Sequence, residues 1–198
     1  MKDYYEELWQ RLPDDLEAPD YALRRAFLLA AVRPGVSALD LGCGAGRFTA
    51  ELAGAGARPV GVEVAEAALA RARRRHAELD FRLVPIGGPL PFADGAFELV
   101  WASEVIEHVA DTAPWLSEVR RVLAPRGRLL LTTPNHTRLA ILAHGLERYS
   151  EPLGDHLHLY TGKSLAATLA EFAFEQISVQ SAGGPPLGRA LLLASATR

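Results

Sequence analysis

Short apolar runs alternate with stretches of helical periodicity along most of the chain, and this alternation limits the possible folds more than any other feature. It is typical of βαβ units, which form a parallel sheet with helices on both faces. The predicted strands are Ser37–Leu41, Pro59–Val64, Phe81–Val84, Phe97–Ala102 and Arg128–Thr133, and the predicted helices between them are Phe48–Ala53, Ala65–Glu78 and Thr112–Leu123.

The first part of the chain reads as helical. One helix is predicted at Tyr4–Arg11 and a second at Asp20–Val32. Asp20 is a suitable N-cap for the second helix, and Pro34-Gly35 would end it. These residues therefore precede the sheet and do not contribute strands to it.

The last part of the chain departs from the alternation. A helix at Ser164–Phe172, capped by Thr161, is followed by two apolar runs at Phe174–Ser181 and Arg189–Ala196. The link through Gly183-Gly184-Pro185-Pro186 is too short for a crossover helix, so the two strands should pair antiparallel. The predicted fold class is α/β, a doubly wound and mostly parallel sheet that ends in an antiparallel C-terminal hairpin.

Composition excludes several classes of protein. The 198 residues are 49% hydrophobic and 23% charged, which suits one compact domain over residues 1–198. A net charge of −3 and a pI near 6.1 argue against a surface for nucleic acid or anionic membrane. Cys43 is the single cysteine, so no internal disulfide can form. Without an apolar signal core at the start or a run of about 20 apolar residues, we expect a cytoplasmic protein with no membrane span.

The stretch SALDLGCGAGRF, residues 37–48, contains the most specific loop of the chain. A glycine turn between a first strand and a helix is where open α/β sheets bind nucleotide-like ligands. The spacing is G-x-G-x-G, and Arg47 stands where a dinucleotide site needs its last glycine. Asp40 directly before the loop would repel a pyrophosphate but would suit an ammonium or sulfonium group. The loop therefore predicts a ligand that is cationic at this point.

Glu63 supplies the second part of the predicted ligand site. It lies at the tip of the second strand, about 20 residues beyond the loop, where a carboxylate can accept hydrogen bonds from both ribose hydroxyls. A ribose next to a cationic amino-acid group, without phosphates, describes S-adenosylmethionine.

Five stretches in order resemble the signatures of the class I S-adenosylmethionine-dependent methyltransferases, from residue 36 to the C-terminus. They are VSALDLGCGAGRFT, GVEVAE, LPFADGAFELVWASEVIEHV, LAPRGRLLLTTPN and DHLHLYTGKSLAATLAEFAFE. Five ordered signatures are far more specific than one glycine loop. The resemblance is to the small-molecule branch that includes the ubiquinone-biosynthesis O-methyltransferases. It implies a Rossmann-like fold and in-line methyl transfer to a small-molecule acceptor, whose nucleophile stays open between oxygen, nitrogen and carbon.

The resemblance also implies roles for individual residues. Backbone at the three loop glycines would approach the methionine part of the cofactor, Asp40 would orient its amino group, and Glu63 with Val64 beside it would hold the ribose. Ser103 and Glu104 would line the methyl end. Where the family usually has an acid for the adenine amino group, this chain has Ile86 and Gly87, whose backbone and apolar contact would replace it. The full predicted cofactor set is Asp40, Gly42, Gly44, Gly46, Glu63, Val64, Ile86, Gly87, Ser103 and Glu104.

Three residues are candidates for a general base, if the acceptor must lose a proton. His136 directly follows the fifth strand and is the first choice, ahead of His108 and Glu104. His108 is better explained by packing, and catalysis by positioning alone remains open. His156 and His158 have the spacing of two metal ligands on an extended segment, but no cysteine or obvious third ligand accompanies them, so we expect no metal.

The chain divides by expected role into four parts. Residues 1–35 would form N-terminal helices and a cap, 36–134 the cofactor-binding core, 135–160 an acceptor-side cap, and 161–198 the C-terminal helix and hairpin. The acceptor should enter between the N-terminal helix and His136–Tyr160. Two alternative functions stay open: an S-adenosylmethionine-binding protein without turnover, and, less favoured by the glycine spacing, a NAD(P)-dependent oxidoreductase.

Overall fold

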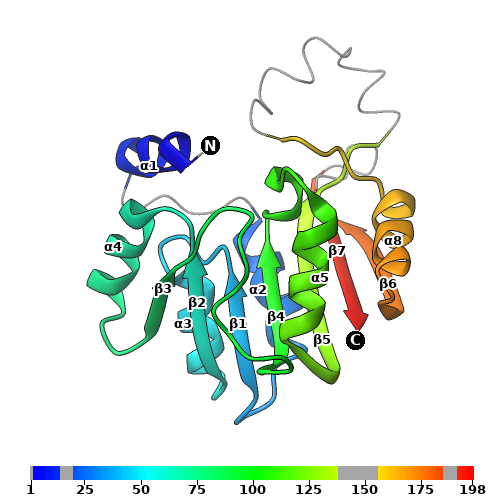
Figure 1. Cartoon of the computed structure of the whole chain (residues 1–198), viewed down its shortest axis with the longest axis horizontal. Coiled ribbons are helices and arrows are strands. Elements are labelled where there is room, and N and C mark those ends of the chain that lie inside the picture. Colours follow the sequence, from blue (N-terminus) through cyan, green and yellow to red (C-terminus); the bar gives the residue numbers. More distant parts are fainter. Residues whose placement is uncertain (1, 14–19, 138–155, 185–190) are drawn as a thin grey trace.

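The computed structural model describes residues 2–13, 20–137, 156–184 and 191–198 (Figure 1). These residues contain a seven-stranded sheet in the order β3-β2-β1-β4-β5-β7-β6. The strands are β1 Ser37–Leu41, β2 Arg58–Glu63, β3 Asp80–Leu83, β4 Phe97–Ser103, β5 Leu123–Pro134, β6 Glu175–Ala182 and β7 Leu191–Thr197. The helices are α1 Lys2–Arg11, α2 Tyr21–Leu29, α3 Arg47–Gly54, α4 Glu66–Arg75, the short 3₁₀ helix η1 Ile106–His108, α5 Thr112–Val122 and α8 Gly162–Glu171.

The directions of the strands agree with the predicted fold class. The pairs β1–β2, β1–β4, β2–β3 and β4–β5 are parallel, whereas β7 runs antiparallel to both β5 and β6. The prediction of a doubly wound, mostly parallel sheet with a C-terminal antiparallel pair is confirmed. The link that joins β6 to β7 lies partly outside the described residues.

Both faces of the sheet are apolar because helices cover both. Leu130 packs on one face with Leu28 of α2 and Leu52 of α3, which lie behind the sheet in Figure 1. On the opposite face, Leu129 belongs to a cluster with residues of α5 and α8, such as Leu116. Successive strand residues point to opposite faces, so a strand buried on both sides must be apolar throughout, as the LLL run of β5 is.

Several element ends differ from the predicted ones. Asp20 is the N-cap residue of α2 as predicted, but it has a left-handed backbone, φ +54°, and its side chain accepts no capping hydrogen bond. Thr161 does cap α8, in a reciprocal arrangement with Ser164. Helix α4 ends at Arg75 instead of Glu78, and β5 begins at Leu123, with a register shift against β4 that precedes the regular pairing.

The order of the strands fixes where a ligand can bind. The chain passes from β1 outward through β2 to β3 and then returns to form β4 on the other side of β1. At such a switch point the loops after two neighbouring strands diverge and leave room for a ligand at the carboxyl edge. The glycine loop after β1 and the loop after β4 lie at this point. Among the described residues, no helix has the length and apolarity to cross a membrane.

Replacement of Leu130 by alanine should destabilise the fold by about 2–5 kcal/mol, because its fully buried side chain fills the space between β5 and the α2–α3 layer. Urea denaturation of the two proteins measures the change. Leu83→Ala on edge strand β3 is the matched control, since Leu83 is 43% exposed, and it should cost about 0.5 kcal/mol or less. Equal losses in the two variants would contradict the assigned core.

Candidate functional site

The glycine loop is tied to the end of β2 by its own backbone. The N–H groups of Gly42 and Cys43 both donate to the carbonyl of Val62, at 2.9 and 3.0 Å. Gly46 then turns the chain into α3 with a φ of +80°, and Gly44 has a φ of +53°. L-residues with side chains rarely adopt this left-handed region, so glycine is required at both positions by the backbone itself.

Side chains from three other elements fill the space above the glycines. A Cβ on Gly44 would lie 2.8 Å from the ring of Trp9 in α1, and one on Gly46 would lie 2.6 Å from the ring of Phe81 in β3. A Cβ on Gly42 would lie 2.5 Å from Cγ2 of Val105, in the loop after β4. The missing side chains therefore let α1, β3 and the loop after β4 each pack closely against the glycine loop.

Glu63 accepts three backbone hydrogen bonds at the carboxyl edge of the sheet. Its Oε2 accepts a hydrogen bond from the Gly44 N–H at 3.0 Å, and its Oε1 accepts from the N–H groups of Val64 and Ala65 at 2.7 and 3.2 Å. Burial raises the pKa of Glu63, and the three backbone donors act against that rise. The carboxylate thus joins the loop after β1 to the turn after β2.

Asp40 is at the end of β1 and is more deeply buried than Glu63. Its side chain is 2% exposed and accepts a 2.6 Å hydrogen bond from the hydroxyl of Thr49 in α3. Burial, with the charge of Glu63 nearby, raises the pKa of Asp40 to about 7, although Thr49 opposes the rise. Near neutral pH this carboxyl group changes its charge.

Helix α1 lies over the carboxyl edge next to α4 (Figure 1). Glu6 accepts hydrogen bonds from the N–H groups of Glu66 and Ala67 at 2.6 and 2.9 Å, so it satisfies free donors at the start of α4. Arg71 donates to the carbonyl of Leu12 at 2.7 Å. These contacts hold Trp9 above the glycine loop. No sequence motif indicated this position of Trp9.

The loop after β3 provides an open surface. Ile86 is 39% exposed, and Gly87 next to it has a φ of +65° with nothing within 4 Å of the position of a Cβ. Exposed apolar surface on a turn beside Glu63's strand is suited to the face of a planar ring. Contact with adenine at these two residues stays a prediction.

Ser103 and Glu104 close β4 in a hydrogen-bonded group. The Ser103 and Thr132 hydroxyls lie 2.9 Å apart, and Thr132 also donates to Glu104 Oε1 at 3.1 Å. Glu104 Oε2 forms a 3.2 Å ion pair with Arg24 of α2, which is 5% exposed. With a φ of +56°, Glu104 has a backbone that is uncommon for a residue with a side chain. Its carboxylate is engaged on both oxygens.

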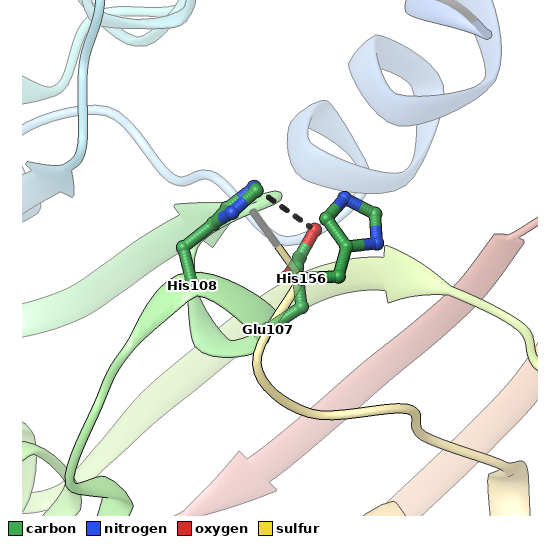
Figure 2. Close-up of side chains that lie close together, drawn as sticks. All are labelled: Glu107, His108 and His156. Carbon is green, nitrogen blue, oxygen red and sulfur yellow. Dashed lines mark ion pairs between the residues drawn. The ribbon is translucent and has the colours of Figure 1, made fainter. Parts of the chain in front are cut away.

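Glu107, His108 and His156 lie together beside this group (Figure 2), and His136 is near His156. The ring centroid of His156 lies 4.8 Å from that of His108 and 6.0 Å from that of His136. Glu107 Oε1 lies 3.9 Å from Nε2 of His108. Burial, followed by the charge of Glu104, raises the pKa of Glu107 to about 8. Burial also lowers the pKa of His136 to about 4, with a further contribution from His156, so His136 is neutral at pH 7 and a weak base.

His156 and His158, which have the spacing of two metal ligands but were expected to bind no metal, lie in different surroundings. The Nε2 atom of His158 lies 2.9 Å from the carbonyl of Val109 and 3.3 Å from the hydroxyl of Thr112, whereas His156 belongs to the cluster described above. Glu107 was not predicted as a site residue, although the sequence has it next to His108. Its burial could not be inferred from the local pattern.

Comparison with known proteins gives a family match over the core. The family model for a methyltransferase domain matches residues 39–131. This range begins in β1 and ends in β5, so it contains the glycine loop, Glu63 and the loop after β4.

Relatives known by sequence agree with this match. The chain is 37% identical over 101 residues to a probable S-adenosylmethionine-dependent methyltransferase of Mycolicibacterium smegmatis, over 51% of this chain and 39% of the relative. It is 38% identical over 113 residues to the demethylmenaquinone methyltransferase of Beutenbergia cavernae, over 57% of this chain and 47% of the relative. The chain thus spans less than half the length of either relative.

A solved structure supports the fold. The 1,6-didemethyltoxoflavin-N1-methyltransferase of Burkholderia thailandensis, determined with 1,6-didemethyltoxoflavin and S-adenosylhomocysteine bound, matches with a TM-score of 0.71 at 18% identity. The match covers 100% of this chain and 83% of that one. At this identity the structural match shows a shared fold, and the family model together with the relatives identifies residues 39–131 as a methyltransferase domain.

Proposed function

We propose that this protein transfers the methyl group of S-adenosylmethionine to a small-molecule acceptor. The observation that carries the proposal is the position of Glu63, a buried carboxylate at the end of β2 that is hydrogen-bonded to the glycine loop through Gly44. Each carboxylate oxygen can accept more than one hydrogen bond, so Glu63 retains capacity for ribose hydroxyls while it holds the loop.

The remaining cofactor contacts follow from this anchor. With the ribose at Glu63, the adenine extends toward Ile86 and Gly87 after β3. The methionine part lies along Gly42 and Gly44 toward β4, in place of the Trp9 ring that covers Gly44 in the free protein. Asp40 below the loop provides the negative charge that favours a cationic amino group. This orientation directs the methyl group to the loop after β4.

The acceptor then lies between α1 and the segment before α8. The ring of Tyr5 in α1 is 6.2 Å from the ring of His108, and His108 is 4.8 Å from His156. Aromatic and imidazole groups from both sides suit a flat acceptor. The B. cavernae relative is named a demethylmenaquinone methyltransferase, so phenols and quinols are the first compounds to test. The rest of the proposed acceptor cap, residues 138–155, lies outside the described residues.

We expect catalysis to depend on the position of the acceptor and not on a general base among these side chains. The sulfonium already activates the methyl group, so alignment of the acceptor atom with the S–CH3 bond is the main requirement. As a base, His136 is disfavoured by a pKa of about 4, and Glu104 is paired with Arg24.

The same observation favours one alternative, a protein that binds S-adenosylmethionine without turnover. Release of S-adenosylhomocysteine from S-adenosylmethionine, measured against panels of phenols, quinols and amines, separates the two functions. Turnover with any acceptor supports the enzyme. Tight cofactor binding with no turnover across all three panels would favour the binding protein.

The Glu63→Gln variant should bind S-adenosylhomocysteine at least about tenfold more weakly, because hydrogen bonds to a charged acceptor contribute about 1.5–3 kcal/mol. Isothermal titration calorimetry measures this loss. Glu66→Gln is the control, since Glu66 is an exposed acid three positions along that pairs with Arg73, and it should bind as the parent protein does. Unchanged affinity in Glu63→Gln would move the ribose elsewhere.

Affinity for S-adenosylhomocysteine should rise with pH around neutrality. The pKa of Asp40 is near 7 in the free protein, and the cationic amino group of the ligand favours the ionised form, so binding below pH 7 must release a proton. Between pH 6 and pH 8 the affinity should increase about tenfold, and in Asp40→Asn it should stay flat over that range. A parent protein with no pH dependence would argue against an amino group at Asp40.

Trp9 should report cofactor binding, since its ring covers Gly44 where the methionine part is proposed to lie. Titration with S-adenosylhomocysteine should change the intrinsic tryptophan fluorescence, and Trp9→Phe should lose most of that change. Trp115→Phe, which alters a half-buried tryptophan of α5, is the control and should keep it. A signal that persists in Trp9→Phe would separate α1 from the cofactor.

A further inference from the structure

Glu107, His108 and His156 bring three metal-ligating side chains to one point at the carboxyl edge. One ligand atom from each lies within 4.8 Å of the other two. In Figure 2 the carboxylate of Glu107 lies between the two imidazole rings, with Oε1 directed at His108. Two of the residues are neighbours in η1, and the third comes from the segment before α8.

Main-chain hydrogen bonds hold this distant segment against η1. The carbonyl of Glu107 accepts from the N–H groups of Leu157 and His158, at 2.8 and 3.1 Å. The same residue therefore provides a carboxylate to the cluster and fixes the backbone next to His156. Main-chain hydrogen bonds thus fix the position of His156 relative to Glu107.

One carboxyl oxygen of Glu107 accepts no hydrogen bond from the described residues. The side chain is 0% exposed, and its Oε2 accepts a 2.9 Å hydrogen bond from the hydroxyl of Thr133 in β5. Within the described part of the chain, its Oε1 has no hydrogen-bond partner, and the Nε2 of His108 at 3.9 Å is too far to be one. A buried carboxyl oxygen without a hydrogen-bond partner is costly, and a bound cation would remove the cost.

We propose that Glu107, His108 and His156 bind one divalent first-row transition-metal ion. Two imidazoles and one carboxylate form a ligand set of zinc and non-haem iron sites that keep positions open for other ligands. With metal–ligand bonds of about 2.0–2.2 Å, the ligand atoms of a tetrahedral site lie about 3.3–3.6 Å apart. The ligand atoms now lie within 4.8 Å of one another, so the more distant pairs must approach by about 1.5 Å or less to bind one ion. Thr133 provides the outer hydrogen bond that ligating carboxylates commonly have.

The location suits a role for the ion in methyl transfer, and this role rests on the proposed function. Val105, two residues before Glu107, lies directly over Gly42 of the glycine loop, so the ion would be close to the proposed methyl end of the cofactor. A hydroxyl bound at an open metal position loses its proton to water more readily. The alkoxide or phenolate lone pair would then form the new O–CH3 bond while the S–CH3 bond breaks, and its electron pair would leave on a neutral thioether sulfur. The inferred acceptor class is therefore a hydroxyl compound.

Calorimetric titration with Zn²⁺ alone tests the site in the full chain, without cofactor or acceptor. The protein is first stripped with a chelator and dialysed. We expect one high-affinity equivalent of Zn²⁺, and a loss of at least about 100-fold in affinity in Glu107→Gln and in His156→Gln. His156 is half-buried, so its variant keeps the test valid if the fully buried Glu107→Gln fails to fold. His76→Gln at the end of α4 is the matched control and should bind Zn²⁺ as the parent does.

Absence of a high-affinity equivalent in the parent, or unchanged binding in His156→Gln, would overturn the metal site. Titration of the same samples with S-adenosylhomocysteine separates this inference from the proposed function. Retained cofactor binding without Zn²⁺ binding would reject the metal alone. Zn²⁺ binding without cofactor binding would support the metal site and reject the proposed function.

Discussion

The hydrogen bonds between Glu63 and the backbone on either side of it are the constraint on which the rest of the site depends. Oε2 holds Gly44 in the loop after β1, and Oε1 holds Val64 and Ala65 in the turn after β2. Together with the hydrogen bonds from Gly42 and Cys43 to the Val62 carbonyl, this buried carboxylate fixes the separation of the two loops. A ligand that binds Glu63 meets a surface already assembled, which lowers the entropy cost of binding.

The strand order places a second group of residues next to the first. Since β4 returns beside β1, the loop after β4 packs against the glycine loop, with Val105 over Gly42. The same loop continues into Glu107, whose carbonyl anchors the segment that contains His156. The glycine loop, the imidazole cluster and the proposed acceptor side are thus joined through short contacts at one edge. The ion pair of Arg24 with Glu104 supports that edge from α2.

Much of the fold could be predicted from the sequence, because the period of apolar residues and the position of glycines are local signals. The parallel core, the antiparallel C-terminal pair and the Thr161 cap followed from such signals, and the position of Glu63 followed from its spacing to the glycine loop. The contact of Trp9 with Gly44 and the burial of Glu107 depend on distances between elements far apart in the chain, and no local pattern encodes them. Residue type also predicted Asp20 at the N-cap position of α2, but not its left-handed backbone or the lack of a side-chain capping hydrogen bond.

The central claim is that Glu63 and the glycine loop form the cofactor site of a methyltransferase. A crystal structure of the protein with S-adenosylhomocysteine tests it most directly. The account predicts ribose hydroxyls within about 2.6–3.0 Å of the Glu63 carboxylate, with the amino-acid part of the ligand over Gly42 and Gly44. A ligand bound away from the ends of β1 and β2, or a ribose without contact to Glu63, would contradict it.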